Sequence, residues 1–515
     1  MRKLRTKEGI GLHPVMTLLI LCLGIILISG ILNLFNVQST FNQISLKTGE
    51  YQVTTEAVTS LLSLSGLKYI FTNTVSNFAN FAVLPHLIII LLGIGIMEKS
   101  GFLKTLVTLL TKKAKKTTVT FALVLICILA SIMGDLSYII FIPLSALLFQ
   151  YGKRNPMIGI IAAFAGLTLG SGISFLLTSI DSSLISTTLL NAHILQANYT
   201  ISPFAFIFIM LIITIIMAIF ITHITENIIA KKVPKYEFEN NEELEEDLVI
   251  TKKKRRGLTF AILAGAIYLL IFIYNIIPGL PFSGNLLDYS QTLYIDKLFS
   301  FDSFFSNGFV FIVTVFFVIL GLAYGIGAKT INNNKEFIEA LGSSLNGIGK
   351  ILLMIFAAAT FISIVKQTNI GNMIAGTFAN LIGNTTFTGL PLILLLFLAS
   401  VVTTIFLPSS ISKWAILATT AVPTLMNAGI SPEFAQVVFR LGESVTMGLT
   451  PLLAYFIVYL AYLEKYNQNN KSFKLSTAIK YQYPYALTSL FVFVIIIVVW
   501  YLIGLPLGIS SGIAL

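Results

Sequence analysis

The chain has 515 residues, of which 56% are hydrophobic and only 11% are charged, and its formal net charge is +11. No soluble domain has enough polar surface for this composition, which excludes a soluble enzyme, a nucleic-acid-binding protein and a secreted disulfide scaffold. The two cysteines, Cys22 and Cys127, lie inside apolar runs, so neither a disulfide framework nor a cysteine metal site is expected. We therefore predict a polytopic membrane protein.

The chain opens with a basic segment, and an apolar run at about 13–34 follows it. This run is long enough to span a bilayer, and it lacks a small-residue cleavage site, which favours a retained helix over a signal peptide. Further apolar runs follow in chain order near 81–97, 118–150, 157–190, 203–228, 257–277, 303–326, 347–365, 388–427, 433–461 and 484–507.

The basic residues indicate which loops lie in the cytoplasm. With a cytoplasmic N-terminus, 27 of the 33 Lys and Arg residues fall in cytoplasmic segments, namely 1–12, 98–117, 151–155, 229–256, 328–350 and 463–482. This bias follows the positive-inside rule and explains the net charge without a nucleic-acid partner. We expect a multi-pass protein of the cell membrane with its N-terminus in the cytoplasm.

The run 118–150 has basic residues at both ends, at 112–116 before it and at 153–154 after it. Both ends are therefore expected in the cytoplasm, so the run enters the membrane and returns. Its middle contains Gly134, Asp135 and Ser137, which are polar and flexible enough for a turn. We predict a re-entrant helical hairpin, whose tip must be buried in protein or face an aqueous cavity.

A second interrupted run, 388–427, has no basic residue in its flanks and is expected to enter from the opposite side. Aligning Tyr138 with Trp414 also aligns Gly172 with Gly448, which indicates an inverted repeat of the two halves. The middle of this second hairpin is polar and contains Ser409, Ser410, Ser412 and Lys413.

Each hairpin is followed by a segment that we expect to be broken at mid-membrane. These broken helices are 157–190 and 433–461, and their predicted breaks contain Gly170, Gly172, Ser174, Thr450 and Pro451. The predicted fold is all-α, with nine transmembrane helices and two re-entrant hairpins. The predicted parts are an N-terminal half, a charged cytoplasmic linker and a C-terminal half, at 1–232, 233–256 and 257–515.

Paired hairpins and broken helices are typical of secondary transporters, because opened helix ends free backbone groups to bind an ion or substrate. Ionisable residues at such positions are costly in a bilayer and indicate a task or a partner. Asp135 is interpreted as a helix cap or a functional group, and Asp181 as a proton or ligand site or a helix cap. Lys413 is interpreted as a structural counter-ion or a substrate contact.

Arg440 and Glu443 share one helix face, which predicts either a structural ion pair or a guanidinium that binds a substrate carboxylate. Trp414 follows the second hairpin tip, where its ring could stack on an aromatic substrate. The four histidines have no metal-ligand spacing, and we expect neither a metal nor a cofactor.

Several ordered blocks of the chain resemble the p-aminobenzoyl-glutamate transporter (AbgT) family, and the likeness runs from His13 to Gly508. The blocks that carry it are Gly134–Leu144, Gly152–Pro156, Ala162–Gly166, Ser412–Ala418, Ser431–Glu433, Arg440–Ser444 and Trp500–Gly508. The resemblance implies a bowl-shaped homodimer with nine membrane helices and two hairpins in each subunit. It also implies transport of p-aminobenzoyl-glutamate, or export of sulfonamide antimetabolites coupled to the proton gradient.

A bound sodium ion is also known in that family. Carried over by position, the resemblance places Asp181, Trp414, Arg440, Glu443 and Pro451 in the substrate pocket. The chain departs from the family pattern, which has aspartate at Glu443, serine at Ile411 and asparagine at both Ser174 and Thr404.

These observations together predict a secondary transporter that moves an aromatic or carboxylate-bearing solute by alternating access, with H⁺ favoured over Na⁺ as the coupling ion. The alternative within the same class is a sodium-coupled dicarboxylate or amino-acid transporter. A channel and a membrane enzyme that acts on a lipid-linked substrate are the rivals from other classes. The expected partners are the solute, the lipid bilayer and a second copy of the chain.

Overall fold

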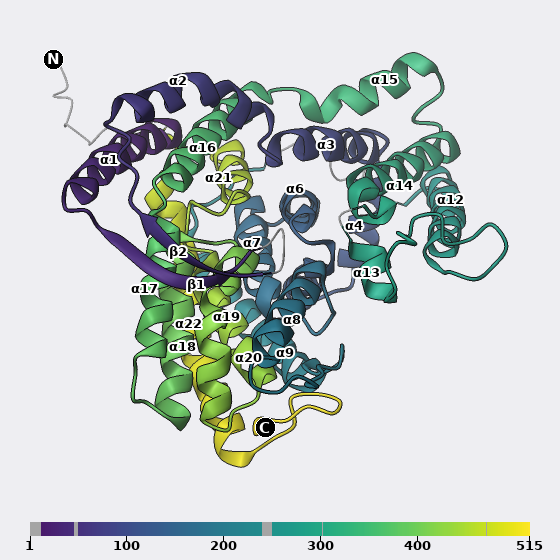
Figure 1. The fold of residues 1–515 in the computed structure, drawn as a ribbon. Helices are drawn as coiled ribbons and strands as arrows, with labels where there is room; N and C mark the ends of the chain where they lie inside the picture. Colours follow the sequence, from purple (N-terminus) through teal and green to yellow (C-terminus); the bar gives the residue numbers. More distant parts are fainter. Residues whose placement is uncertain (1–11, 46–49, 239–249, 301, 470) are drawn as a thin grey trace, which may run out of the picture.

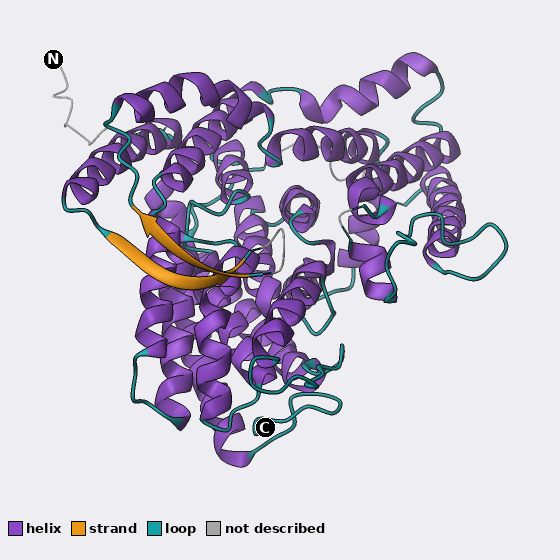
Figure 2. Cartoon of the chain, viewed as in Figure 1, coloured by secondary structure: helices purple, strands orange, loops and turns teal. Residues whose placement is uncertain are grey.

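The computed structural model describes residues 12–45, 50–238, 250–300, 302–469 and 471–515. Figure 1 shows long helices packed around a buried centre, and Figure 2 shows one two-stranded sheet lying across them. Within the described residues, ten helices are long and apolar enough to cross a membrane. This confirms a helical, polytopic membrane protein, whereas the division into nine crossings and two re-entrant hairpins stays a prediction.

The N-terminal half consists of the elements α1 (Pro14–Leu34), β1 (Gln38–Ile44), β2 (Tyr51–Ala57), α2 (Leu64–Ala79), α3 (Val83–Lys99), α4 (Phe102–Thr111), α5 (Lys116–Leu129), the 3₁₀ turn η1 (Ala130–Met133), α6 (Leu136–Tyr151), α7 (Pro156–Ile173), α8 (Ser179–Ala192), α9 (Ile207–Ile224), the π-helical η2 (Thr225–Ile229) and α10 (Ala230–Lys232). The C-terminal half consists of α12 (Lys252–Ile276), α13 (Tyr294–Phe299), α14 (Phe304–Ala328), α15 (Asn334–Gly342), η3 (Ser343–Leu345), α16 (Gly349–Gln367), α17 (Ile370–Gly383), α18 (Gly389–Phe406), α19 (Ser410–Asn427), α20 (Pro432–Met447), α21 (Phe456–Lys465) and α22 (Leu475–Ile503).

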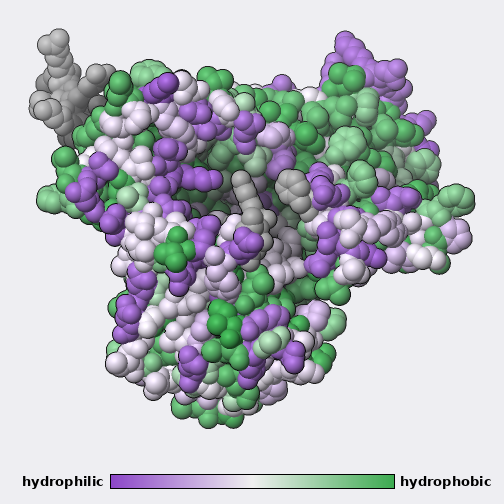
Figure 3. Space-filling model, in the orientation of Figure 1, coloured by the Kyte–Doolittle hydropathy of each residue, from purple (hydrophilic) through white to green (hydrophobic). Residues whose placement is uncertain are grey.

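Helices α12 and α14 pack on each other at one side of the molecule, where α14 also packs on α3 (Figure 1). Their outer faces carry exposed apolar side chains such as Leu270 and Phe311, which are 68% and 66% exposed. Such apolar outer faces are suited to contact with the lipid chains of a membrane. Figure 3 shows apolar side chains over this side, and hydrophilic ones on both sides of a recess in the middle of the face.

The first predicted hairpin consists of α5, η1 and α6, and its chain reverses at Gly134, whose φ is +57°. The two ends of the hairpin lie together. The Arg154 guanidinium, just after α6, donates to the Lys116 carbonyl at the start of α5 (3.1 Å) and to the Thr120 hydroxyl (2.9 Å). It also forms an ion pair with Glu226 of η2 at 2.6 Å. The two ends of this helix pair therefore lie side by side, and its re-entrant course through the membrane stays a prediction.

The second predicted hairpin consists of α18 and α19, joined by three residues, Leu407, Pro408 and Ser409. The Ser409 hydroxyl caps α19 by accepting from the Ser412 backbone N–H at 3.4 Å. The interruption thus lies where the sequence places it.

The two helix breaks include the predicted residues Ser174, Thr450 and Pro451 but not Gly170 or Gly172. Helix α7 continues through Gly170 and Gly172, and the chain is irregular only at 174–178; likewise α20 continues to Met447, and the irregular segment is 448–455. The glycines allow close packing instead. A Cβ on Gly170 would lie 2.6 Å from the Ile128 backbone, and one on Gly172 would lie 2.5 Å from the Arg440 carbonyl oxygen.

Several parts of the fold lie outside the sequence prediction. Strands β1 and β2 pair antiparallel, with Gln38 opposite Ala57, and the amphipathic helices α2 and α17 accompany the predicted apolar runs. Helix α12 begins at Lys252, inside the predicted linker 233–256. The acidic cluster of that linker, 242–247, lies outside the described residues, and the division into two halves and a linker stays a prediction.

We predict that single cysteines at Lys113 and Lys153 are labelled from the same side of the membrane, because the two ends of the first hairpin meet at Arg154. In intact cells both should resist a membrane-impermeant maleimide and react after permeabilisation. The native Cys22 and Cys127 are buried and give a low background. A cysteine at Tyr289, in the loop before α13, is the control and should react in intact cells; reaction of only one hairpin end from outside would contradict the re-entrant topology.

Candidate transport site

A cavity of about 350 Å³ lies where the two hairpin tips and the two helix breaks meet. This volume falls within the range of small-molecule binding sites. The first tip, α7 with its following break, the second tip and the second break supply its lining, which is Ser131, Gly134, Asp135, Ser137, Tyr138, Leu167, Ser171, Thr178, Ile180, Pro408, Ser409, Ser410, Ile411, Met447, Leu452, Leu453, Ala454 and Tyr455. Elements from both halves of the chain therefore enclose one space.

Asp135 lies at the first tip, directly before α6, and is exposed to the cavity. It occupies the N-cap position of α6, but its side chain makes no capping hydrogen bond. The interpretation of Asp135 as a helix cap is therefore wrong. Its neighbour Ser137 instead donates its hydroxyl hydrogen to the Gly134 carbonyl at 2.7 Å and stabilises the turn.

A cluster of four charged residues lies directly behind the cavity wall. The Arg440 guanidinium contacts two carboxylates, Glu443 on the same helix and Asp181 of α8, the latter at 3.1 Å. The Lys413 ammonium forms an ion pair with the other oxygen of Glu443 at 3.2 Å. Two positive and two negative charges sum to zero, which allows a buried cluster to persist in a low-dielectric interior.

Residues of the cavity wall bind this cluster directly. The Ser410 hydroxyl donates to Glu443 Oε1 at 3.0 Å, and the Ser171 carbonyl accepts from Arg440. The Thr178 hydroxyl donates to Asp181 Oδ2 at 2.7 Å. A change of charge or position in the cluster would therefore shift the wall residues Ser410, Ser171 and Thr178 that are bonded to it.

Asp181 caps α8, which is one of its two predicted roles, whereas its role as a proton or ligand site stays a prediction. It forms a reciprocal capping box with Thr178 at the start of α8, and its other oxygen binds Arg440. Its side chain is 16% exposed, whereas that of Glu443 is fully buried. Asp181 also lines a second, smaller cavity of about 180 Å³, together with Gly172 and Ser174.

Lys413 and Trp414 both point into the protein core and are fully buried. Lys413 also contacts the Thr404 hydroxyl and lies 5.2 Å from the centre of the Phe439 ring, which fits the structural counter-ion interpretation. The Trp414 ring packs on Phe439 with a centroid separation of 4.4 Å, and its N–H donates to Thr188 at 2.9 Å. A contact of Trp414 with substrate would require this packing to open.

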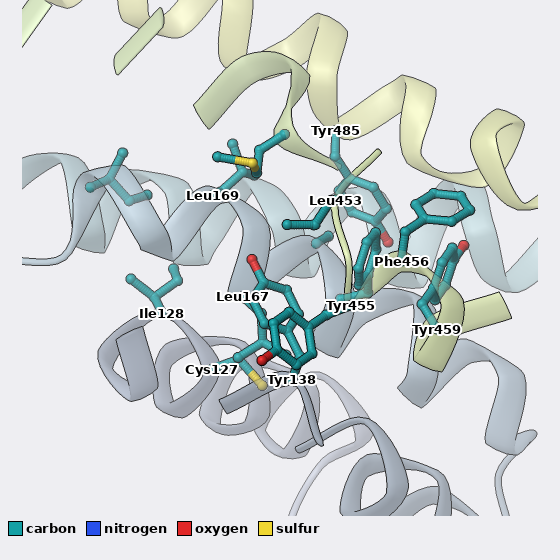
Figure 4. Packing of buried hydrophobic residues seen from close by; sticks show 14 of the residues in the cluster. Cys127, Ile128, Tyr138, Leu167, Leu169, Leu453, Tyr455, Phe456, Tyr459 and Tyr485 are labelled. Carbon is teal, nitrogen blue, oxygen red and sulfur yellow. The ribbon is translucent and has the colours of Figure 1, made fainter. Parts of the chain in front are cut away.

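Aromatic side chains continue from the cavity wall into the core (Figure 4). The Tyr138 and Tyr455 rings stack with centroids 5.5 Å apart and an interplanar angle of 11°. Behind them Phe164 stacks on Tyr459 at 4.2 Å. This ring packing joins the first hairpin tip to the second helix break. Its outer pair, Tyr138 and Tyr455, lines the cavity.

The cavity does not contain the residues that the resemblance selects. Among the predicted tip residues, Asp135, Ser137, Ser409 and Ser410 line it, whereas Trp414, Arg440, Glu443 and Pro451 do not. Ser412 bonds to Ser409 in the second tip, and the Thr450 hydroxyl fixes the second break by donating to the Ile405 carbonyl at 2.7 Å. Sequence reasoning missed the lining residues Ser131, Leu167, Ile180, Met447, Leu452, Leu453 and Tyr455.

Comparison with known proteins now decides the family. The model of the AbgT putative transporter family matches residues 7–515. The chain belongs to the AbgT family. It is therefore a multi-pass membrane transporter and not an enzyme.

The chain is 27% identical over 497 residues to the p-aminobenzoyl-glutamate transport protein of Escherichia coli (strain K12). The aligned region covers 96% of this chain and 93% of that protein. Two solved structures are similar as well. The YdaH transporter of Alcanivorax borkumensis is 27% identical, with 96% and 100% of the two chains covered and a TM-score of 0.48. MtrF of Neisseria gonorrhoeae, described within a class of antimetabolite efflux pumps, is 29% identical, with 99% and 100% covered and a TM-score of 0.49.

We predict that Gly172→Ala destabilises the protein by about 1–3 kcal/mol, because the added methyl group would press on the Arg440 carbonyl and on Ser444. The melting temperature of the purified protein in detergent measures the effect. Gly24→Ala is the matched control, since no atom lies within 4 Å of its Cβ position in α1. Equal melting temperatures for the two variants would contradict the close packing of α7 on α20.

We predict that Lys413→Met destabilises the protein by about 3 kcal/mol or more, because it leaves an uncompensated negative charge on the buried Asp181–Arg440–Glu443 group. Lys366→Met, at the exposed end of α16, is the control and should have little effect. Thermal unfolding followed by intrinsic fluorescence compares the two. A Lys413→Met protein as stable as the control would show that the ammonium is not needed to balance the cluster.

Proposed function

We propose that this protein is a proton-coupled secondary transporter of p-aminobenzoyl-glutamate or a related aromatic carboxylate, working by alternating access in the cell membrane. The observation that carries the proposal is Arg440, which is bound by two carboxylates immediately behind a cavity enclosed by both hairpin tips. The E. coli relative, named a p-aminobenzoyl-glutamate transport protein, supports the substrate class.

Competition for Arg440 provides a physical route to coupling. A substrate carboxylate can bind the guanidinium well only when one of the two resident carboxylates is neutralised or moves away. Asp181 is the accessible one, since its side chain is partly exposed and lines the smaller cavity, whereas Glu443 is fully buried between two cations. Protonation of Asp181 would therefore free Arg440 for the substrate, and deprotonation would restore the internal ion pair and favour release.

The charge balance favours H⁺ over Na⁺ as the coupling ion. The Lys413 ammonium already provides a fixed positive charge beside Glu443, so this carboxylate needs no metal ion to balance it. The chain also has Ser174 and Thr404 where the family pattern has asparagine, which removes two carbonyl oxygens suited to a hard cation. A homodimer with its N-terminus in the cytoplasm completes the proposal.

We predict that Asp181→Asn abolishes gradient-driven accumulation of p-aminobenzoyl-glutamate in proteoliposomes, reducing it at least about tenfold. Because asparagine resembles the protonated acid, equilibrium binding should persist and lose its dependence on pH. Glu339→Gln, on the exposed face of α15, is the control for loss of a carboxylate and should transport normally.

Transport should be measured with the Na⁺ and pH gradients varied independently. Flux driven by a pH gradient without Na⁺ is the expected result. Flux that needs Na⁺ and ignores the pH gradient would support the sodium-coupled alternative. Undiminished proton-driven flux in Asp181→Asn would refute the role of Asp181.

A further inference from the structure

We propose that the tip of the first hairpin is a subsite for the amino group of an aromatic substrate, with Asp135 and Ser131 as the hydrogen-bond acceptors. This inference rests on the proposed function and deepens it, because it assigns one end of the substrate to one wall of the cavity.

Asp135 is the only charged residue among those that line the larger cavity. In the described part of the chain its carboxylate has neither a hydrogen-bond partner nor an ion-pair partner. The buried charges nearby, those of Asp181, Arg440, Glu443 and Lys413, already balance one another. The Asp135 carboxylate, exposed to the cavity and without a partner, is therefore available to a ligand that donates hydrogen bonds.

Ser131 provides a second and independent observation at the same tip. Its side chain is 93% buried, lines the cavity and has no hydrogen-bond partner for its hydroxyl oxygen within the described residues. Other hydroxyls of the wall are already engaged, those of Ser171 with the Thr168 carbonyl and Ser410 with Glu443. Buried hydroxyls are normally satisfied, so an unsatisfied one beside an unpaired carboxylate indicates a ligand with N–H groups.

The residues that line the cavity around this tip favour an amino group attached to an aromatic ring. Tyr138 and Tyr455 form a stacked pair at the cavity wall (Figure 4). Leu167, Leu452 and Leu453 supply apolar surface to the same cavity. An arylamine matches both features, because its ring is apolar and its amino group donates two hydrogen bonds and accepts poorly.

The second hairpin tip lies close to a positively charged group, in contrast to the negatively charged Asp135 at the first tip. Ser410 of that tip connects the cavity to Glu443 and, through it, to Arg440, the group that binds a carboxylate in the proposed function. The cavity thus has acceptors at one tip and a buried guanidinium behind the other. A solute with an aromatic amine at one end and a carboxylate at the other fits this polarity.

The test compares two ligands that differ only in the amino group, p-aminobenzoyl-glutamate and benzoyl-glutamate, by isothermal titration calorimetry on the purified full-length protein. The unmodified protein should bind the amino compound at least about tenfold more tightly, because the hydrogen bond involves a charged acceptor. Asp135→Ala should keep at most the about threefold preference that Ser131 still provides, with an unchanged affinity for benzoyl-glutamate. Ser131→Ala should reduce the preference about threefold, as expected for a neutral hydrogen bond.

Glu339→Gln is the control carboxylate and should keep the full preference. Because Asp135→Ala could disturb the tip, Asp135→Asn provides an isosteric second variant, and retained binding of benzoyl-glutamate reports an intact cavity in both. An undiminished preference in both Asp135 variants, or an unmodified protein that binds the two ligands equally, would overturn the inference and leave the proposed function in place. Failure of the unmodified protein to bind either ligand would overturn the proposed function, and this inference with it.

Discussion

The structure depends on the Arg440 guanidinium, which forms ion pairs with two carboxylates. Arg440 lies on α20 in the C-terminal half, and one of its two carboxylate partners, Asp181, lies on α8 in the N-terminal half. Burial of each of these charges alone would cost several kcal/mol, so the cluster is stable only while all members are present and correctly charged. The ion pairs therefore connect the two halves at the cavity, and a single proton is enough to change the balance. The same contact serves stability and, in the proposed function, coupling.

Charge and chain order predicted the larger features of the fold. Basic residues on both sides of 118–150 indicated a segment that returns, and Arg154 indeed lies against Lys116. The polar interruption near Pro408 was equally visible, because no continuous apolar helix accommodates it. The strands β1 and β2 were missed because a search for long apolar runs does not register short polar strands that alternate in burial.

Gly170 and Gly172 were wrongly placed in a break because glycine has two structural uses that the sequence does not distinguish. In α7 and α20 the absence of a Cβ lets neighbouring helices approach, and the backbone stays helical through Gly172 and Gly442. The residues that line the cavity from the second break, such as Leu452 and Tyr455, were missed for another reason: irregular backbone has no periodicity that would identify which side chains point inward. The family resemblance placed Asp181, Arg440 and Glu443 in one pocket, but it did not indicate which of these charged residues form ion pairs with one another.

The β1–β2 hairpin has a mechanical consequence. It binds helices of both halves at once: the Tyr51 hydroxyl donates to Asn191 of α8 at 2.9 Å, the Thr419 hydroxyl of α19 donates to the Asn42 carbonyl at 2.8 Å, and Asn380 of α17 donates to the Thr40 carbonyl at 2.9 Å. Any displacement that separated α8 from α19 would have to break these bonds. The strands thus tether α8 of one half to α17 and α19 of the other.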